Sequence, residues 1–147
     1  MLGLCFQVAG LRFAMDCRQL VEVVPQIDVR PLLPAVAGVR GLALWRGRSL
    51  PVLDLGVILA GAPCAERLST RLIVARVGEA CVGLLAERAT DLVSFDDDGM
   101  LPPGIQVPGA PYLGPVAPQD GKLVQVLSVA ELVPAEVLAL LDGGARA

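Results

Sequence analysis

Apolar residues along most of this chain come in short runs that glycine or proline interrupts. Within several runs the apolar positions alternate with others, as Leu11, Phe13 and Met15 alternate with Arg12 and Ala14. Alternation places one set of side chains on a core face, and short runs between turn residues are typical of strands. The pattern predicts an all-β protein of about ten short antiparallel strands.

The boundaries of the runs predict hairpins and one irregular link. Glycine accepts positive φ without steric cost, so the turns at 9–10, 46–48 and 78–79 are expected to close hairpins, the second with two arginines at its tip. Residues 25–41 contain three prolines and predict an irregular connection, with at most a short helix around Ala35. The expected strands are 4–9, 11–16, 20–24, 42–45, 49–53, 71–77, 80–86, 89–95, 112–116 and 122–127.

Capping residues predict two or three short helices. An Asp or Ser side chain at a helix start accepts a hydrogen bond from an unpaired backbone N–H, and a Glu three residues later completes a capping box. Pro134 lies too deep for a helix that begins at Ser128, so a separate helix is expected there. The expected segments are one turn after Asp16, residues 55–60 between Asp54 and Gly61, a turn at 129–133 under the Ser128–Glu131 capping box, and residues 134–141.

The order of these elements repeats once. Residues 11–61 and 80–133 each run through strands, an irregular link, a hairpin-like pair and a short helix. Short antiparallel strands suit small closed or nearly closed barrels, because closure removes unpaired hydrogen-bonding edges. A chain of 147 residues is one domain by default. We therefore predict a single domain, residues 1–147, with two related barrel subdomains that are intertwined in sequence.

Composition first raises the question of a membrane and then disfavours it. The chain is 54% hydrophobic with a mean hydropathy of +0.65, yet its longest uncharged stretch, residues 100–119, carries six prolines. Such a stretch cannot span a bilayer as a helix. The start of the chain alternates like a strand and does not resemble a signal peptide, so we expect a cytoplasmic protein. A pI of about 4.8 and a single lysine disfavour nucleic-acid binding.

The absence of histidine removes most catalytic constellations at once. Ser-His-Asp triads, Cys-His pairs, histidine-containing zinc motifs and phosphohistidine transfer all need an imidazole. The four cysteines show no CxxC spacing and are expected to be buried structural thiols. The run 96–99, Asp-Asp-Asp-Gly, has Val107 where a calcium loop needs a bidentate Glu, which favours a solvated acidic turn. We expect no enzymatic activity, no metal and no cofactor.

Residues 41–55, GLALWRGRSLPVLDL, carry the most specific motif of the chain. They resemble the signature of the chemotaxis coupling protein family, the CheW-like domain, in which a Gly-aliphatic-x-Asn-aromatic or Leu-Arg-Gly stretch precedes apolar-Pro-Val-x-Asp-Leu. This chain departs from the pattern at Leu44, where the family usually has Asn, and its link 34–41 is longer than usual. The resemblance covers about residues 3 to 141, and the stretches 13–24, 83–92 and 122–132 also agree with the family.

The resemblance implies a fold and a role. The fold is two pseudo-symmetric five-stranded SH3-like β-barrels with two or three short helices. The role is that of a scaffold, without catalysis of its own, which joins the cytoplasmic tip of a chemoreceptor (methyl-accepting protein) to the regulatory domain of a CheA-type histidine kinase. No kinase segment fits in 147 residues, so a stand-alone coupler is expected, held at membrane-bound receptor arrays by protein contacts. Flagellar chemotaxis and a surface-sensing, cyclic-dinucleotide output both remain open.

The resemblance also implies which residues face the receptor. An arginine on a rigid hairpin tip presents a planar fork to carboxylates or carbonyls, whereas without the motif Arg46 would be a solvated turn charge. Trp45 is either barrel core, which we favour, or an interface anchor. The kinase contact is placed only in the second barrel and the short-helix region. The family's receptor-facing groove maps to Glu22, Gly41, Leu42, Leu44, Arg46, Gly47 and Leu92.

A binding module for a small apolar ligand or a peptide is the alternative function. The high aliphatic content and the lack of catalytic groups motivate it. A large thermal stabilisation by a hydrophobic ligand, with no receptor fragment present, would favour this second function.

Overall fold

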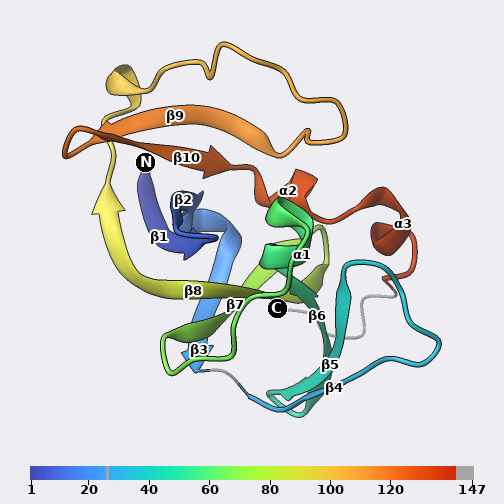
Figure 1. Cartoon of the computed structure of the whole chain (residues 1–147). Coiled ribbons are helices and arrows are strands. Elements are labelled where there is room, and N and C mark those ends of the chain that lie inside the picture. The colour runs from blue at the N-terminus through green and yellow to red at the C-terminus, as the bar shows by residue number, and fades with distance from the viewer. Residues whose placement is uncertain (26, 142–147) are drawn as a thin grey trace.

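In the computed structural model, which describes residues 1–25 and 27–141, ten strands form one continuous sheet with short helices at its margins (Figure 1). The all-β prediction is confirmed. The strands are β1 (Leu2–Val8), β2 (Leu11–Asp16), β3 (Leu20–Pro25), β4 (Val29–Arg30), β5 (Val39–Trp45), β6 (Arg48–Asp54), β7 (Thr70–Val77), β8 (Ala80–Ser94), β9 (Leu113–Gln119) and β10 (Lys122–Leu127). The helices are α1 (Leu55–Ala60), α2 (Val129–Leu132) and α3 (Ala135–Leu138), with 3-10 turns at Cys17–Gln19 and Asp97–Gly99.

The long strand β8 joins two halves of the sheet. Its first part pairs with β7 and β6, and its second part pairs with β1 (Figure 1). One half is therefore β4-β5-β6-β8-β7-β3, around a core that includes Leu50 and Val74. The other half is β8-β1-β2-β10-β9, and Leu101, which follows β8, bridges Val116 of β9. The largest cluster of buried side chains draws on strands of both halves and on α2 and α3.

The two halves exchange strands in a symmetric way. β6 of the first repeat runs parallel to β8 of the second, and β10 of the second runs parallel to β2 of the first. β6 is the second strand of the β5–β6 hairpin and leads into the short helix α1. β10 is the second strand of the β9–β10 hairpin and leads into the short helix α2. The predicted pseudo-symmetric, intertwined pair of subdomains thus has a physical basis, since neither repeat completes its strand pairing alone. The extent of the domain over 1–147 stays a prediction.

Two expectations about strands were wrong. Residues 80–86 and 89–95 were expected as separate strands, but β8 is continuous because Arg88 takes a positive φ of 52° and bends the strand without ending it. The link 25–41 was expected to be irregular, but it contains β4, which pairs with β5. The described part of that link contains no helix around Ala35.

The expected caps at Asp16 and Asp54 are confirmed, whereas the capping box is wrong. The carboxylates of Asp16 and Asp54 accept hydrogen bonds from the N–H groups of Arg18 and Gly56, respectively. The Ser128 side chain makes no capping bond, and its backbone N–H donates to Tyr112 O at 2.8 Å. The helix expected at 134–141 is only α3, because hydrogen bonds to residues three positions back tighten the chain after it.

Among residues 1–25 and 27–141, no helix is both long enough and apolar enough to cross a bilayer.

Candidate functional site

The centre of the candidate site is a Trp-Glu-Arg cluster at the β5–β6 hairpin. The indole Nε1–H of Trp45 donates to Glu22 Oε1 at 2.6 Å, and Arg46 Nη2 lies 3.3 Å from the same oxygen. The Arg46 guanidinium also stacks over the Trp45 ring, 4.7 Å from its centroid. Trp45 is only 5% exposed and belongs to the core of its half, so the prediction of a core tryptophan is confirmed. A buried ring therefore supports an exposed cation.

The hairpin turn fixes the position of Arg46. Arg46 and Gly47 have φ angles of 48° and 72°, which are the two positive values of a two-residue hairpin turn. Such turns favour Asn, Asp or Gly. The conformation of the turn therefore does not account for an arginine in its first position. Arg48 was expected at the tip, but it is the first residue of β6. The guanidinium carried by the two-residue turn itself is that of Arg46, which is 58% exposed.

The predicted residues on β5 divide between its two faces. Leu42 is half-buried and Leu44 is 75% exposed, so both lie on the outer face that leads to Arg46. Gly41 is buried and has a φ of 151°; a Cβ there would stand 2.0 Å from Arg30 O. Gly41 thus permits the close approach of β4 to β5, which sequence reasoning did not foresee.

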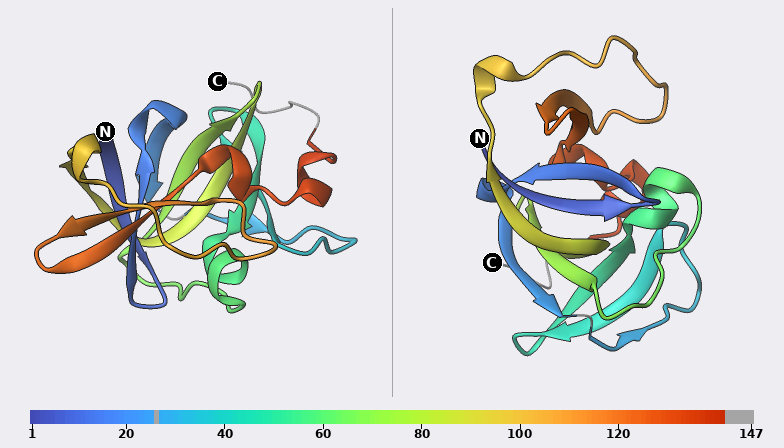
Figure 2. Two further views of the ribbon diagram at one scale, coloured as in Figure 1. Left: turned by 90° about the horizontal axis from the view of Figure 1, so that it is seen from above. Right: turned by 60° about the vertical axis from the view of Figure 1, so that its left-hand side comes forward.

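Leu92 does not join this cluster. It lies in the second part of β8, opposite Leu4 of β1, and is 63% exposed. In Figures 1 and 2 the end of β8 and the β5–β6 hairpin lie apart, on different sides of the molecule. The fold therefore brings together Glu22, Arg46 and Gly47, extends them along Leu42 and Leu44, and leaves Leu92 elsewhere.

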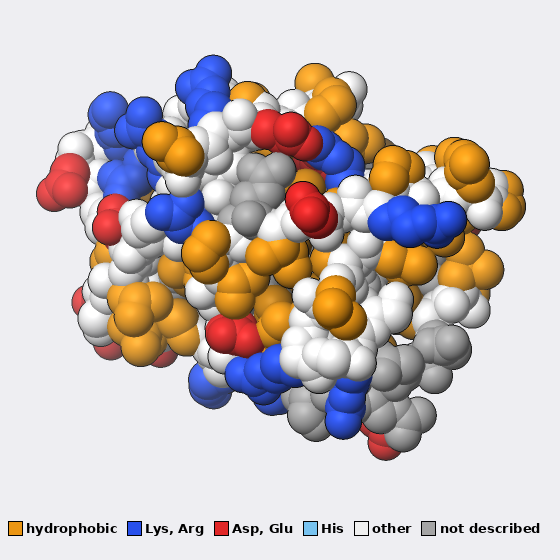
Figure 3. All heavy atoms as spheres, turned by 90° about the horizontal axis from the view of Figure 1, so that it is seen from below, with side chains coloured by type: hydrophobic (Ala, Val, Ile, Leu, Met, Phe, Trp, Pro, Cys, Tyr) orange, Lys and Arg blue, Asp and Glu red, His pale blue; other side chains and the backbone are white. Residues whose placement is uncertain are grey.

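The surface around the hairpin mixes apolar and basic groups. The face seen in Figure 3, below β4 and β5 in Figure 1, carries hydrophobic side chains between Lys or Arg side chains and a few carboxylates. Leu44, on the outer face of β5, is 75% exposed. Exposed apolar side chains beside an aromatic-supported arginine are typical of protein-protein contact surfaces.

A buried carboxylate anchors the far end of the hairpin. Asp54, with a side chain 2% exposed, accepts hydrogen bonds from the N–H groups of Gly56 and Cys64 at 2.8 and 3.0 Å. Arg40 Nη1 lies 2.6 Å from its other oxygen, and Arg40 Nη2 reaches Glu66 at 2.7 Å. Asp54 thereby ties β5, α1 and the loop after α1 to one point. Sequence reasoning found the cap but not the ion pair or the loop contact.

The buried thiol of Cys64 beside this carboxylate is expected to resist alkylation. Burial, and then the nearby Asp54 charge, raise the pKa of Cys64 from 9.0 to about 12. The neutral thiol donates to Leu85 O at 3.5 Å. With iodoacetamide at pH 8, mass spectrometry should therefore find Cys17, which is half-buried, modified well before Cys64.

The same raised pKa determines the direction in which the free energy of unfolding changes with pH. Between pH 9 and 12 the unfolded chain releases the Cys64 proton first, so the free energy of unfolding should fall as pH rises. In Cys64→Ser this part of the slope should be absent. If iodoacetamide alkylated Cys64 as fast as Cys17 in the folded protein, that result would contradict a buried, neutral Cys64 thiol beside Asp54.

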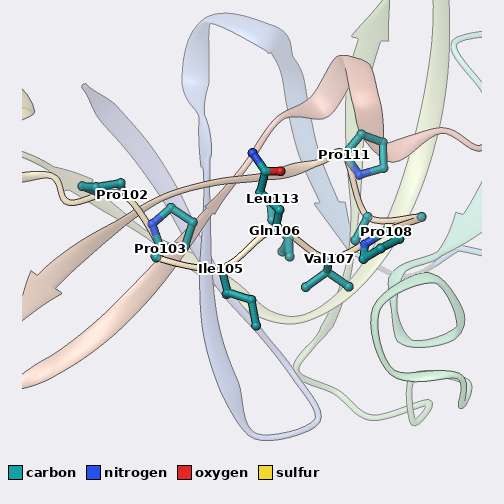
Figure 4. A pocket seen from close by; sticks show the side chains of 11 residues that line it. Pro102, Pro103, Ile105, Gln106, Val107, Pro108, Pro111 and Leu113 are labelled. Atoms are coloured by element: carbon teal, nitrogen blue, oxygen red, sulfur yellow. The ribbon is translucent and has the colours of Figure 1, made fainter.

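A cavity of about 1000 Å³ lies under the proline-rich loop that precedes β9 (Figure 4). Its labelled side chains include Pro103, Ile105, Val107 and Pro111, and no acid, base or nucleophile is among the residues that line it. The cavity can make apolar and backbone contacts but cannot move a proton. At the acidic turn before this loop, Asp96 accepts from the N–H of Asp98, as in an ordinary cap.

Comparisons with known proteins agree with this fold. A model of the CheW-like domain matches residues 2–137. Protein FrzA of Myxococcus xanthus is 30% identical over 99 residues, which are 67% of this chain and 62% of FrzA, so the chain matches less than two thirds of that relative. Chemotaxis protein CheW of Thermotoga maritima is 24% identical over 130 residues, 88% of this chain and 85% of that protein.

A solved structure has the same architecture. The crystal structure of the scaffolding protein TtCheW from Thermoanaerobacter tengcongensis superposes with a TM-score of 0.81 at 18% sequence identity. The superposition covers 97% of this chain and 89% of TtCheW, which confirms the expected CheW-like fold. Because the family match spans nearly all of the described residues, the chain belongs to the CheW-like domain family.

Proposed function

We propose that this protein is a non-catalytic adaptor that couples the cytoplasmic tips of methyl-accepting chemoreceptors to the regulatory domain of a CheA-type histidine kinase. Membership of the CheW-like family and a relative named as a chemotaxis protein support a role in chemosensory signalling. The observation that supports the coupling of receptor to kinase is the Glu22–Trp45–Arg46 cluster at an exposed hairpin tip. We place the protein in the cytoplasm, held at receptor arrays by protein contacts.

The cluster has the physical properties of an interface hot spot. The guanidinium of Arg46 is held on one side by the Trp45 ring and on another by Glu22, so little side-chain entropy remains to be lost on binding. Its remaining N–H groups can donate to carboxylates or carbonyls of a receptor helix. Leu42 and Leu44 supply apolar area next to it. We assign Gly41 and Gly47 a supporting role, since they shape the strand and the turn, and Leu92 a contact separate from this cluster.

Reconstitution with receptor-bearing membranes tests the proposal. Kinase should sediment with membranes that contain the organism's own chemoreceptors when this protein is added, and should stay in the supernatant without it. Sedimentation of the kinase that is independent of this protein would overturn the adaptor role.

Leu44→Asp is expected to weaken receptor binding about tenfold, because it places a charge in the apolar part of the surface. Leu44 is 75% exposed, so the thermal midpoint should change little. Leu68→Asp is the matched control, since Leu68 is 98% exposed in the loop between α1 and β7. Equal binding by both variants in the sedimentation assay would remove Leu44 from the site.

A further inference from the structure

Three arginines from three separate strands line a second cavity, away from the β5–β6 hairpin. The cavity has a volume of about 380 Å³ and lies where the β1–β2 hairpin, the start of β7 and the middle of β8 meet. Arg12 comes from β2, Arg71 from β7 and Arg88 from β8. The hydroxyl-bearing residues Ser69 and Thr90 also line it.

A bulge in β8 builds this cavity. On β1, Cys5 faces Asp91 and Gln7 faces Glu87, so three residues of β8 stand opposite the single residue between them. The positive φ of Arg88 lies within this bulge, and its N–H donates to Ser69 O at 2.9 Å. The bulge thus interrupts the ladder between β8 and β1 at this point. A strained, non-glycine backbone conformation at the rim of a polar cavity is often a feature of a binding site.

The charge of the cavity lining is strongly positive. Three guanidinium groups face one carboxylate, that of Asp91, which leaves two net positive charges in a chain whose net charge is -3. Over residues 1–25 and 27–141, no carboxylate forms an ion pair with Arg12, Arg71 or Arg88. These cations therefore remain available to an external anion.

One of the arginines, Arg71, is held in place by hydrogen bonds before any ligand arrives. Arg71 Nη1 donates to the backbone oxygens of Leu68 and Thr70, the latter at 3.2 Å. Arg12 is half-buried beside the Cys5 thiol, and its charge opposes the rise that burial causes in the Cys5 pKa. Positioned donors bind an anion with a smaller entropy cost than free side chains do.

We propose that this cavity binds the phosphate group of a small phosphorylated molecule. A carboxylate has two oxygens and is satisfied by one guanidinium fork, whereas a phosphate monoester has three acceptor oxygens and nearly two negative charges. Three guanidinium groups arranged around a hollow, with two hydroxyls beside them, match the phosphate better. The volume accommodates a phosphate with a small attached group.

Calorimetry with pyrophosphate, in a phosphate-free and sulfate-free buffer at fixed ionic strength, tests the site. We expect saturable binding of one pyrophosphate per chain, and about tenfold weaker binding in Arg12→Gln and in Arg88→Gln. Arg76→Gln is the control, because Arg76 is an exposed arginine of β7 that does not line the cavity. Its affinity should stay within twofold of the parent protein.

Two results would overturn the proposal. One is the absence of saturable pyrophosphate binding, or equal affinity in all three variants. The other is equally tight binding of tricarballylate, which would show that the cavity does not select phosphate. Arg88 is exposed, so Arg88→Gln should keep the parent's thermal midpoint and decide the question even if Arg12→Gln unfolds.

Discussion

Arg46→Glu is expected to reduce co-sedimentation with receptor-bearing membranes about a hundredfold while the protein stays folded. The change places a second carboxylate next to Glu22, where the parent chain has an ion pair at 3.3 Å. It also removes the cation from the face of Trp45. A hot-spot arginine costs roughly 2 kcal/mol or more on truncation, and charge reversal adds repulsion from any acidic partner group. Because the side chain is 58% exposed, the expected loss of stability is at most about 1 kcal/mol.

The control and the readout of folding follow from the same geometry. Arg76→Glu makes the same charge reversal at an exposed position of β7 and should sediment like the parent protein. Trp45 is the single tryptophan of the chain, so its fluorescence reports on the site itself. An unchanged emission maximum shows that the ring remains buried. If Arg46→Glu sediments with receptor and kinase at the parent level, the receptor site lies elsewhere.

Local patterns in the sequence correctly predicted several turns and helix caps, which depend on neighbouring residues. The turns at Ala9-Gly10 and Gly78, the Asp54 cap and the left-handed Gly61 depend on a few consecutive residues, and all are present. The same reasoning failed at Arg88, because a positive φ at a non-glycine residue leaves no mark in the pattern of apolar positions. A short apolar run interrupted by charge then predicts a strand end where the structure has a bend.

Such local patterns could not predict which strands pair over long distances in the sequence. The parallel pairs β6–β8 and β2–β10 join residues from different repeats, and no turn residue specifies them. The two-residue strand β4 is stabilised by its pairing with β5, which requires the missing side chain of Gly41. Strand propensity within 25–41 was too weak to predict it.

The candidate site, like the fold, was predicted only in part from the sequence. The family resemblance supplied Glu22 and Arg46, and the fold shows why they belong together with Trp45. Resemblance in separate stretches of the sequence could not reveal that Leu92 lies apart from them. The arginines of the second cavity escaped notice because they come from three elements and show no common spacing.

Asp54→Ala is expected to lower the free energy of unfolding by about 3–5 kcal/mol, the largest effect on stability that we expect from a single substitution here. The change leaves the N–H groups of Gly56 and Cys64 without their acceptor and removes the buried partner of Arg40. Gly56 shows how close this packing is, since a Cβ there would stand 2.4 Å from Ala62 O. A loss of that size should lower the thermal midpoint by roughly 10 °C or more.

Two matched variants separate the contributions of Asp54. Asp54→Asn keeps an oxygen that can accept from Gly56 but loses the charge that pairs with Arg40, so about half of the loss is expected. Arg40→Gln removes the other partner, and because Arg40 is partly exposed and also pairs with Glu66, it should cost less than Asp54→Ala. Urea denaturation followed by Trp45 fluorescence measures all three. A loss below about 1 kcal/mol in Asp54→Ala would mean that the loop after α1 does not depend on this carboxylate, since an N-cap alone accounts for that much.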